Sequence, residues 1–294
     1  MKRRRLILTG ALAAVLAGIV LAWPRGPKEP VYQGKKLSRW MREAYEDGIR
    51  GTSKYRRAQI DAAREAIKAI GTNAVPFLLS EFDNPVSSRA MQFNRWAIRN
   101  NLRGLRMATG QDRRSLATLS LYLLGPKAAP AVPALVPRLT DTEQGKSAAQ
   151  AMSQCTAIAV PHVLDYYSGT NGHLLEFALG RLVMSVGAYE EELRPIVELL
   201  KHTNALVRGA AAGSLRFARP QPLTVVPVLS KALSDPDSGV QDRAAASLQS
   251  LGTNAITSVS TLRRLLERSD PEVVAWASNA LFRIDPAALP PRGP

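Results

Sequence analysis

Four arginines between positions 95 and 106 are the residues whose spacing most clearly permits chemistry. They follow one another at intervals of four, four and three residues: Arg95, Arg99, Arg103 and Arg106. A helix would place them in one stripe, and guanidinium groups bind phosphate and carboxylate groups through paired hydrogen bonds. The stripe could form a ridge for an anionic lipid, an acidic polymer or an acidic protein, whereas a nucleic acid is not expected as a partner. A solvated helix face, whose arginine stems cover the edge of a neighbouring apolar stripe, is the simpler interpretation. That apolar stripe consists of Met91, Ile98, Leu102 and Leu105.

Two further sets of side chains could bind a metal or react, but their spacing does not indicate a specific site. His173 and Glu176 are one helical turn apart and could offer two metal ligands, although a pair on the surface is the simpler interpretation. Cys155 is the only cysteine, so the chain has no intramolecular disulfide and no cysteine zinc motif. We expect a buried, unreactive thiol on a helix at Cys155, with an intermolecular disulfide or a reactive thiol as the alternatives.

Catalytic motifs are absent from the sequence. It contains no GxSxG, no HExxH and no glycine-rich phosphate loop. We therefore expect a non-enzymatic protein that needs no cofactor and no metal. The remaining features of the sequence describe helices that would position a binding surface.

A repeat of 33 residues organises the second half of the chain. Three columns of residues recur at that period. The first column is Leu174, Val207, Val240 and Val273; the second is Ala178, Ala211, Ala244 and Ala277; the third is Leu182, Leu215, Leu248 and Leu281. The columns are four residues apart, which is the spacing of one helix face. Alanine at the same place in every unit allows neighbouring helices to approach closely.

Each unit also contains an earlier helix and a tight turn. The apolar residues of the earlier helices recur at the same period: Val163, Ile196, Leu229 and Leu262, then Tyr167, Leu200, Leu233 and Leu266. Between the two helices lie SGTN, KHTN, SDPD and SDPE, which are turn and capping residues. Each unit is thus predicted as helix, turn, helix.

Short glycine motifs join one unit to the next. LGTNA at 251–255 repeats IGTNA at 70–74, and LGPKA at 124–128 is a looser copy. We expect Gly71, Gly125 and Gly252 to end a second helix in the left-handed conformation and to lead into the next first helix. Between Pro76 and Pro133 the spacing of equivalent prolines widens, which predicts one enlarged or irregular unit.

The stretch VVPVLSKALSDPDSGVQDRAAASLQSLGTNA and its neighbours resemble HEAT repeats, especially the short HEAT-like class first noted in phycobilisome lyases. The resemblance covers about 70–294 and is strongest from about 160 onward. VYQGKKLSRWM at 31–41 also resembles the segment that precedes the repeats in membrane-tethered bacterial HEAT proteins. The ankyrin motif TPLHxA and the tetratricopeptide Trp-Leu-Gly-Tyr series are absent.

The HEAT resemblance implies an all-α fold, an α-solenoid or superhelix of helix pairs. It also implies a non-enzymatic scaffold that mediates protein–protein interactions. The alternative is an enzyme, or an anion- or nucleic-acid-binding protein, that uses the solenoid groove. The partner proteins are not identified by any motif, and the likeness to lyases implies only the scaffold.

The N-terminus predicts export. MKRRR precedes LILTGALAAVLAGIVLAW, 18 residues without a charge, which as a helix spans roughly 27 Å of a bilayer. The positive cluster should stay in the cytoplasm, so the chain after Trp23 should lie outside it, in a bacterial periplasm. An uncleaved signal-anchor and a signal peptide cleaved after Val20–Ala22, which would release a secreted protein, both remain open.

Charge and composition complete the predicted organisation. Of the net charge of +15, the first 29 residues carry +5, residues 30–123 carry +9 and the remainder +1. We predict a signal-anchor or signal peptide at 1–23, a proline-rich linker at 24–36, capping helices at 37–69 and the solenoid at 70–294. In the capping region, Ser38 should start a helix that packs through Leu37, Trp40, Met41 and Ala44.

Overall fold

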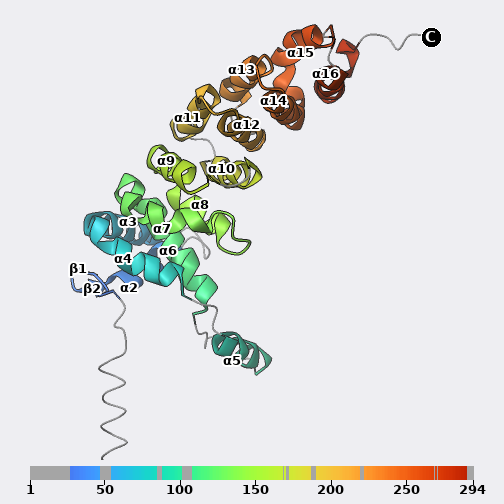
Figure 1. The fold of residues 1–294 in the computed structure, drawn as a ribbon. Coiled ribbons are helices and arrows are strands. Elements are labelled where there is room, and N and C mark those ends of the chain that lie inside the picture. Colours follow the sequence, from blue (N-terminus) through green and yellow to red (C-terminus); the bar gives the residue numbers. More distant parts are fainter. Residues whose placement is uncertain are drawn as a thin grey trace, which may run out of the picture.

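A computed structural model shows a curved stack of helices (Figure 1). The structure describes residues 27–46, 54–84, 88–100, 108–167, 169, 172–186, 190–218, 222–267, 269 and 271–289. The predicted signal or anchor segment at 1–23 lies outside these residues. So do Arg103, Arg106, Leu102 and Leu105.

Helices in pairs make up the stack, as the repeat period predicts. The first helices of the pairs are α2 (Leu37–Glu46), α4 (Val75–Phe82), α7 (Val132–Leu135), α9 (Thr156–Tyr167), α11 (Glu190–Glu198), α13 (Pro222–Ala232) and α15 (Val259–Leu265). The second helices are α3 (Lys54–Ile70), α6 (Gly110–Leu124), α8 (Gly145–Met152), α10 (Gly172–Val186), α12 (Ala205–Ser214), α14 (Ser238–Leu251) and α16 (Pro271–Ile284). The enlarged unit is also confirmed, because α5 (Ser88–Arg99) is inserted between α4 and α6.

The predicted columns form the core of the stack. The alanine column from Ala178 to Ala277 and the leucine column from Leu182 to Leu281 are fully buried, and so are Val163, Ile196, Leu229 and Leu262. The valine column has one exception, since Leu174 is 43% exposed whereas Val207, Val240 and Val273 are buried. The register read from the sequence is therefore correct, with a local break at the start of α10.

The stack curves because its two layers pack differently. The second helices α10, α12, α14 and α16 pack extensively on one another. The first helices α9, α11 and α13 contact one another much less. Small residues allow the close approach in the second layer. The row of second helices consequently follows the inside of the curve, and the first helices diverge along its outside (Figure 1).

Glycines with positive φ mark the ends of second helices. Gly71, Gly125 and Gly252 have φ of 64°, 57° and 60°. At Gly125 and Gly252 the ψ values are −135° and −138°, outside the left-handed helical basin that we expected and in a region open to glycine alone. The chain then continues as the 3-10 helices η1 (Gly71–Ala74), η2 (Gly125–Ala131) and η6 (Gly252–Ser258), which lead directly into the next first helix.

The N-terminal end of the stack is closed by α2. Leu37, Trp40, Met41 and Ala44 are buried, as predicted. Ser38 does not cap the helix with its side chain; its backbone N–H donates instead to Glu29 Oε1 at 2.7 Å. Ahead of α2, within the range interpreted as a linker, β1 (Val31–Tyr32) and β2 (Lys35–Lys36) form an antiparallel hairpin.

The remaining 3-10 segments adjoin helices of the stack: η3 (Val136–Arg138), η4 (Leu199–Lys201), η5 (Leu215–Phe217) and η7 (Pro286–Ala288). Among the described residues, the run Gly110–Arg138 is long and apolar enough to cross a membrane by length and composition. It comprises α6, η2, α7 and η3, breaks at Gly125, and supplies Leu121 and Leu135 to the core. We therefore assign it to the interior of the solenoid.

Candidate partner-binding surface

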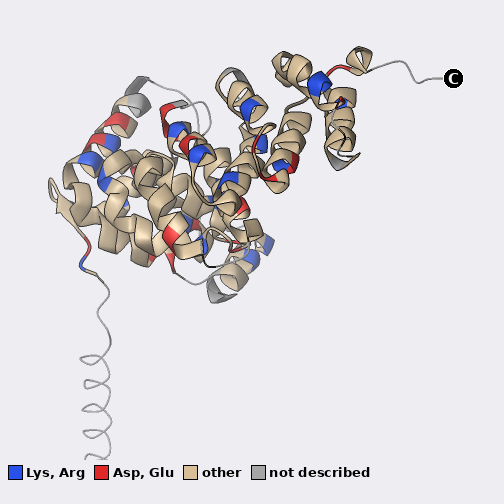
Figure 2. Ribbon diagram, turned by 45° about the horizontal axis from the view of Figure 1, so that its top comes forward, with Lys and Arg blue, Asp and Glu red and all other residues tan. Residues whose placement is uncertain are grey.

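The predicted arginine ridge begins on α5. Arg95 and Arg99 are exposed one turn apart on this helix, and Arg103 and Arg106 lie outside the described residues. In Figure 1, α5 stands away from the stack, and it packs extensively on no other described element. Its twelve residues include no Asp or Glu, whereas both acidic and basic residues occur along the repeats (Figure 2).

Apolar side chains of α5 are also exposed. Met91 is 36%, Trp96 51% and Ile98 63% exposed, and the Trp96 ring lies 5.7 Å from that of Phe93. Of the predicted apolar stripe, Met91 and Ile98 are thus exposed among the described residues, whereas Ala97 on the same helix is buried. A basic helix with exposed apolar residues has the composition of a segment that contacts an anionic surface, and the four-arginine ridge stays a prediction.

The inner layer holds a charge network that spans three repeats. Glu176 on α10 is buried and accepts hydrogen bonds from Arg216 and from Arg243 Nε, the latter at 3.2 Å. Arg243 lies on α14, so the contact passes across the whole of α12. The sequence-based interpretation of His173 and Glu176 as a surface pair is wrong for Glu176, because the two arginines neutralise its carboxylate inside the stack.

Two glycines on α12 make this bridge possible. A Cβ at Gly213 would lie 2.5 Å from Glu176 Cδ, and a Cβ at Gly209 would lie 3.1 Å from Arg243 Nη1. Any other residue at Gly213 would occupy the space that the carboxylate fills. The glycines thus explain how an ion pair joins helices that are not neighbours in the stack.

A second ion pair fixes α12 to the turn of the next repeat. Arg208 donates two hydrogen bonds to Asp235, each of 2.8 Å, and both side chains are nearly buried. The Arg208 guanidinium lowers the pKa of the Asp235 carboxyl despite the opposing effect of burial. The next helix is capped by Asp237, which accepts from Val240 N at 3.1 Å, as the SDPD turn predicts.

Large apolar side chains are exposed on the second helices, at positions outside the predicted columns. Phe177 and Met184 on α10 are 46% and 56% exposed, and Phe282 on α16 is 59% exposed. Each lies on the side of its helix opposite the buried positions, so the helical period places it at the surface, and only its apolar character distinguishes it there. Exposed apolar side chains of this size are typical of surfaces that bind other proteins.

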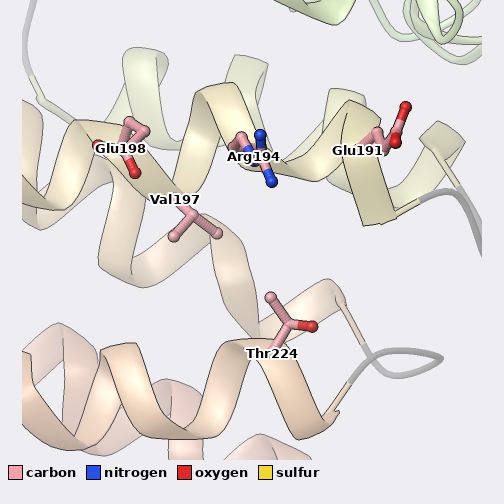
Figure 3. A pocket seen from close by; sticks show the side chains of 5 residues that line it. All are labelled: Glu191, Arg194, Val197, Glu198 and Thr224. Atoms are coloured by element: carbon pink, nitrogen blue, oxygen red, sulfur yellow. The ribbon is translucent and has the colours of Figure 1, made fainter.

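A hollow of about 440 Å³ lies in the outer layer. It is lined by Glu191, Arg194, Val197, Glu198 and Thr224. Figure 3 shows the first four along α11, with Val197 directed toward Thr224 of α13 across the gap. This is the wedge left where the first helices diverge, and its charged groups spread along one helix instead of converging on a point. We therefore place the candidate binding surface on the inner layer.

The described residues offer little reactive chemistry. In that part of the chain, no three His, Cys, Asp or Glu side chains gather as a metal site would require. Cys155 is buried just before α9, and its Sγ donates to Gly125 O at 3.1 Å. Burial, with a smaller contribution from Glu192, raises the pKa of the thiol to about 11. Such a thiol is protonated at neutral pH, as expected for an unreactive cysteine.

Comparison with known proteins points to the repeats alone. A family model described as HEAT repeats matches residues 193–281, and no curated protein matches the chain. Crystal structures of two engineered proteins are 22% and 20% identical to it, with TM-scores of 0.32 and 0.30; they cover 85% and 84% of this chain and 96% and 73% of their own.

The complex of CpcE and CpcF of phycocyanin lyase from Nostoc sp. PCC7120 is also similar. It is 17% identical, covers 89% of this chain and all of its own, and has a TM-score of 0.26. Likenesses of this size say nothing about activity.

Proposed function

Since residues 193–281 of this chain are HEAT repeats, we propose that it is a non-enzymatic scaffold that binds a protein partner at the cell envelope. The observation that carries the proposal is the inner layer of second helices, which presents exposed apolar and charged side chains along a curved face. Stacked helix pairs offer an extended concave surface of the kind that binds proteins. The ion pairs at Glu176 and Asp235 hold that surface in one shape.

The envelope location is supported by the N-terminal sequence. A positive cluster followed by 18 uncharged residues is typical of a signal-anchor or a signal peptide. The basic helix α5 supports a position near anionic lipid, because arginines and large apolar side chains are exposed on it. The scaffold would then face its partner with the nearly neutral repeats that follow.

Site-specific photo-crosslinking in the source cell tests the scaffold. A photoreactive residue replaces Ala246 or Asn279, which are exposed on the second helices α14 and α16, or Glu198 or Arg263, which are exposed on the first helices α11 and α15. We expect protein adducts from the two inner positions and none from the two outer ones. Adducts from the outer positions alone would place the partner on the other layer, and no adducts from any position would overturn the scaffold proposal.

A further inference from the structure

Helix α5 presents arginines and aliphatic side chains on the same face. Met91 and Ile98 are two turns apart, Arg95 lies one turn from each of them, and Arg99 follows Arg95 by one turn. Ile98 is 63% exposed, the most of any large apolar side chain in the described part of the chain, and Met91 is 36% exposed. The two arginines are exposed as well. Aliphatic and cationic groups of α5 therefore share the same surroundings.

Trp96 extends this face on the other side of the arginines. Successive residues of a helix are about 100° apart, which places Trp96 about 60° around α5 from Arg99. Its residue is 51% exposed, and its ring lies 5.7 Å from that of Phe93. An indole ring has an apolar body and a polar N–H, and it favours the boundary between hydrocarbon and water. The arginines thus have apolar neighbours on both sides.

The opposite side of α5 is the one turned toward other residues. Ala97 lies across the helix from the arginines and is only 2% exposed. In contrast, the face with Ile98 and Arg95 stays open, because α5 packs extensively on no other described element and stands away from the stack (Figure 1). The apolar side chains of this face are therefore available to a partner.

The positive charge of the face is also available. The helix contains no Asp or Glu, so its arginines have no acidic partner on their own element. The acidic residues at the end of α4, Glu81 and Asp83, pair instead with Arg113 and Arg138. An occupant of this face must therefore supply anionic groups for the arginines and an apolar environment for Ile98.

An anionic bilayer meets both requirements at once. Its phosphates accept hydrogen bonds from guanidinium groups, and the acyl chains just below them take up aliphatic side chains, with the indole at the boundary. A nucleic acid would bind the arginines but leave Ile98 and Met91 in water. An acidic protein would need an apolar site of matching shape, whereas a bilayer needs none.

The place of α5 in the fold agrees with this occupant. Figure 1 shows α5 at the end of the stack where the described chain begins, opposite the C-terminus. The helix that follows, α6, packs on α2, α3 and α4 at that end. The sequence before residue 24 predicts a membrane anchor, and an anchored chain would hold this end of the stack next to the bilayer.

We propose that α5 is an interfacial membrane helix. It lies in the plane of an anionic bilayer, with Met91, Trp96 and Ile98 inserted at the level of the upper acyl chains and Arg95 and Arg99 bound to phosphates. The inference rests on the envelope location proposed above and adds to it a second membrane contact, which fixes the orientation of the repeats. Attraction by charge alone would leave Ile98 in water, so insertion can be tested separately.

A fluorescent probe in the full chain tests the insertion. Ile98→Cys accepts a polarity-sensitive fluorophore selectively, because Cys155 is buried and its thiol is protonated at neutral pH. The labelled chain is reconstituted into vesicles of phosphatidylethanolamine and phosphatidylglycerol, with or without a spin-labelled lipid. We expect blue-shifted emission that the spin-labelled lipid lowers by about half or more, since the apolar face of an interfacial helix lies among acyl chains.

Matched variants separate α5 from the probe itself. Phe282→Cys places the same fluorophore at a similarly exposed apolar residue at the far end of the stack, where we expect polar emission without quenching. In the Ile98→Cys chain, replacing Arg95 and Arg99 with Gln should return the probe to water, as should vesicles of phosphatidylcholine alone. Circular dichroism should show the parent helix content for each variant, because Gln favours a helix about as well as Arg.

Polar, unquenched emission from position 98 in the anionic vesicles would overturn the proposal; it is the result expected if α5 binds an acidic protein or a nucleic acid. Equal quenching at positions 98 and 282 would also overturn it, because the fluorophore would then cause the insertion. Equal quenching in both kinds of vesicle would rule out the anionic lipid. These failures are distinct from failure of the scaffold, which the crosslinking positions Ala246 and Asn279 on α14 and α16 test.

Discussion

Glu176 illustrates how one residue can tie several repeats together. Its carboxylate is held by Arg216 and Arg243, and it occupies the space that a side chain at Gly213 would need. Gly213→Ala should therefore displace Glu176 and lower the free energy of unfolding by about 1–2 kcal/mol, even though alanine favours the helix. Urea unfolding measures this loss.

The control for that substitution is Gly172→Ala, whose added methyl would meet only Leu206 at an ordinary 3.7 Å. It should not destabilise the protein. The double variant combines Gly213→Ala with Glu176→Ala. If it is as stable as Glu176→Ala alone, the destabilisation by the added methyl group arises from its contact with Glu176, as the geometry requires. Additive losses in that cycle would contradict the steric explanation.

Asp235 should make the stability of the protein depend on pH. Because Arg208 lowers its pKa in the folded state, the ion pair stabilises the protein above the unfolded pKa of about 3.9. That stability is lost as pH falls through the lower folded pKa. Asp235→Asn leaves Arg208 without its charge partner and should cost about 3 kcal/mol at neutral pH. The difference from the parent in thermal unfolding should shrink below about pH 4.

An exposed ion pair provides the comparison. Glu198 and Lys201 pair at 2.7 Å with side chains 54% and 71% exposed, so Glu198→Gln should change stability by less than about 1 kcal/mol at any pH. If Asp235→Asn lowers the stability by the same amount at low pH as at neutral pH, then packing, and not charge, stabilises this turn.

The packing of neighbouring second helices depends on the alanine column. Ala244 on α14 is fully buried in the layer where α12 and α14 pack. Ala244→Leu should overpack this contact and cost about 1–3 kcal/mol in urea unfolding. The same substitution at Ala246, on the exposed side of the same helix, should change stability by no more than about 0.5 kcal/mol. Equal stability of Ala244→Leu and Ala246→Leu would contradict the packing of the second layer.

The arginines on and after helix α5 should bind anionic membranes. A version lacking residues 1–30 should bind anionic vesicles at low salt, and replacing Arg95, Arg99, Arg103 and Arg106 with Gln should remove most of that binding. Each arginine near an anionic surface contributes about 1 kcal/mol, and the attraction should fade at molar salt. Vesicle co-sedimentation measures it.

Four exposed arginines elsewhere serve as the matched control: Arg194, Arg263, Arg264 and Arg283. Replacing these with Gln removes the same charge and should leave binding nearly intact. Equal binding by both quadruple variants, or none by the parent, would return the stripe to a solvated helix face.

The whole molecule is basic at one end, which bears on where it resides. The first 123 residues hold nearly all of the net charge of +15. If residues 6–23 are an uncleaved anchor, the protein should resist extraction with carbonate, and protease should reach its C-terminus only from the periplasmic side. Mass spectrometry that finds a mature N-terminus at Trp23 would exclude the anchor and leave export intact.

Sequence alone determined the repeat, the pairing of helices and most of the core. The apolar positions recur with a period of 33 residues, because each unit must bury the same face against the next. The same reasoning located the enlarged unit before α6. It also located the turns KHTN and SDPD, whose last residues, Asn204 and Asp237, cap α12 and α14. These features depend on residues that are near one another in the chain, so their pattern survives in the sequence.

Tertiary structure alone decided which of those residues remain exposed. Leu174 matches its column, yet it is exposed because α8 begins about six residues late in the repeat frame. Glu176 looks like a surface residue, yet Arg243 reaches it across two glycines from a helix two repeats away. Burial at both places depends on where a neighbouring helix starts and how closely it approaches, and neither distance is encoded in the periodicity of a single helix.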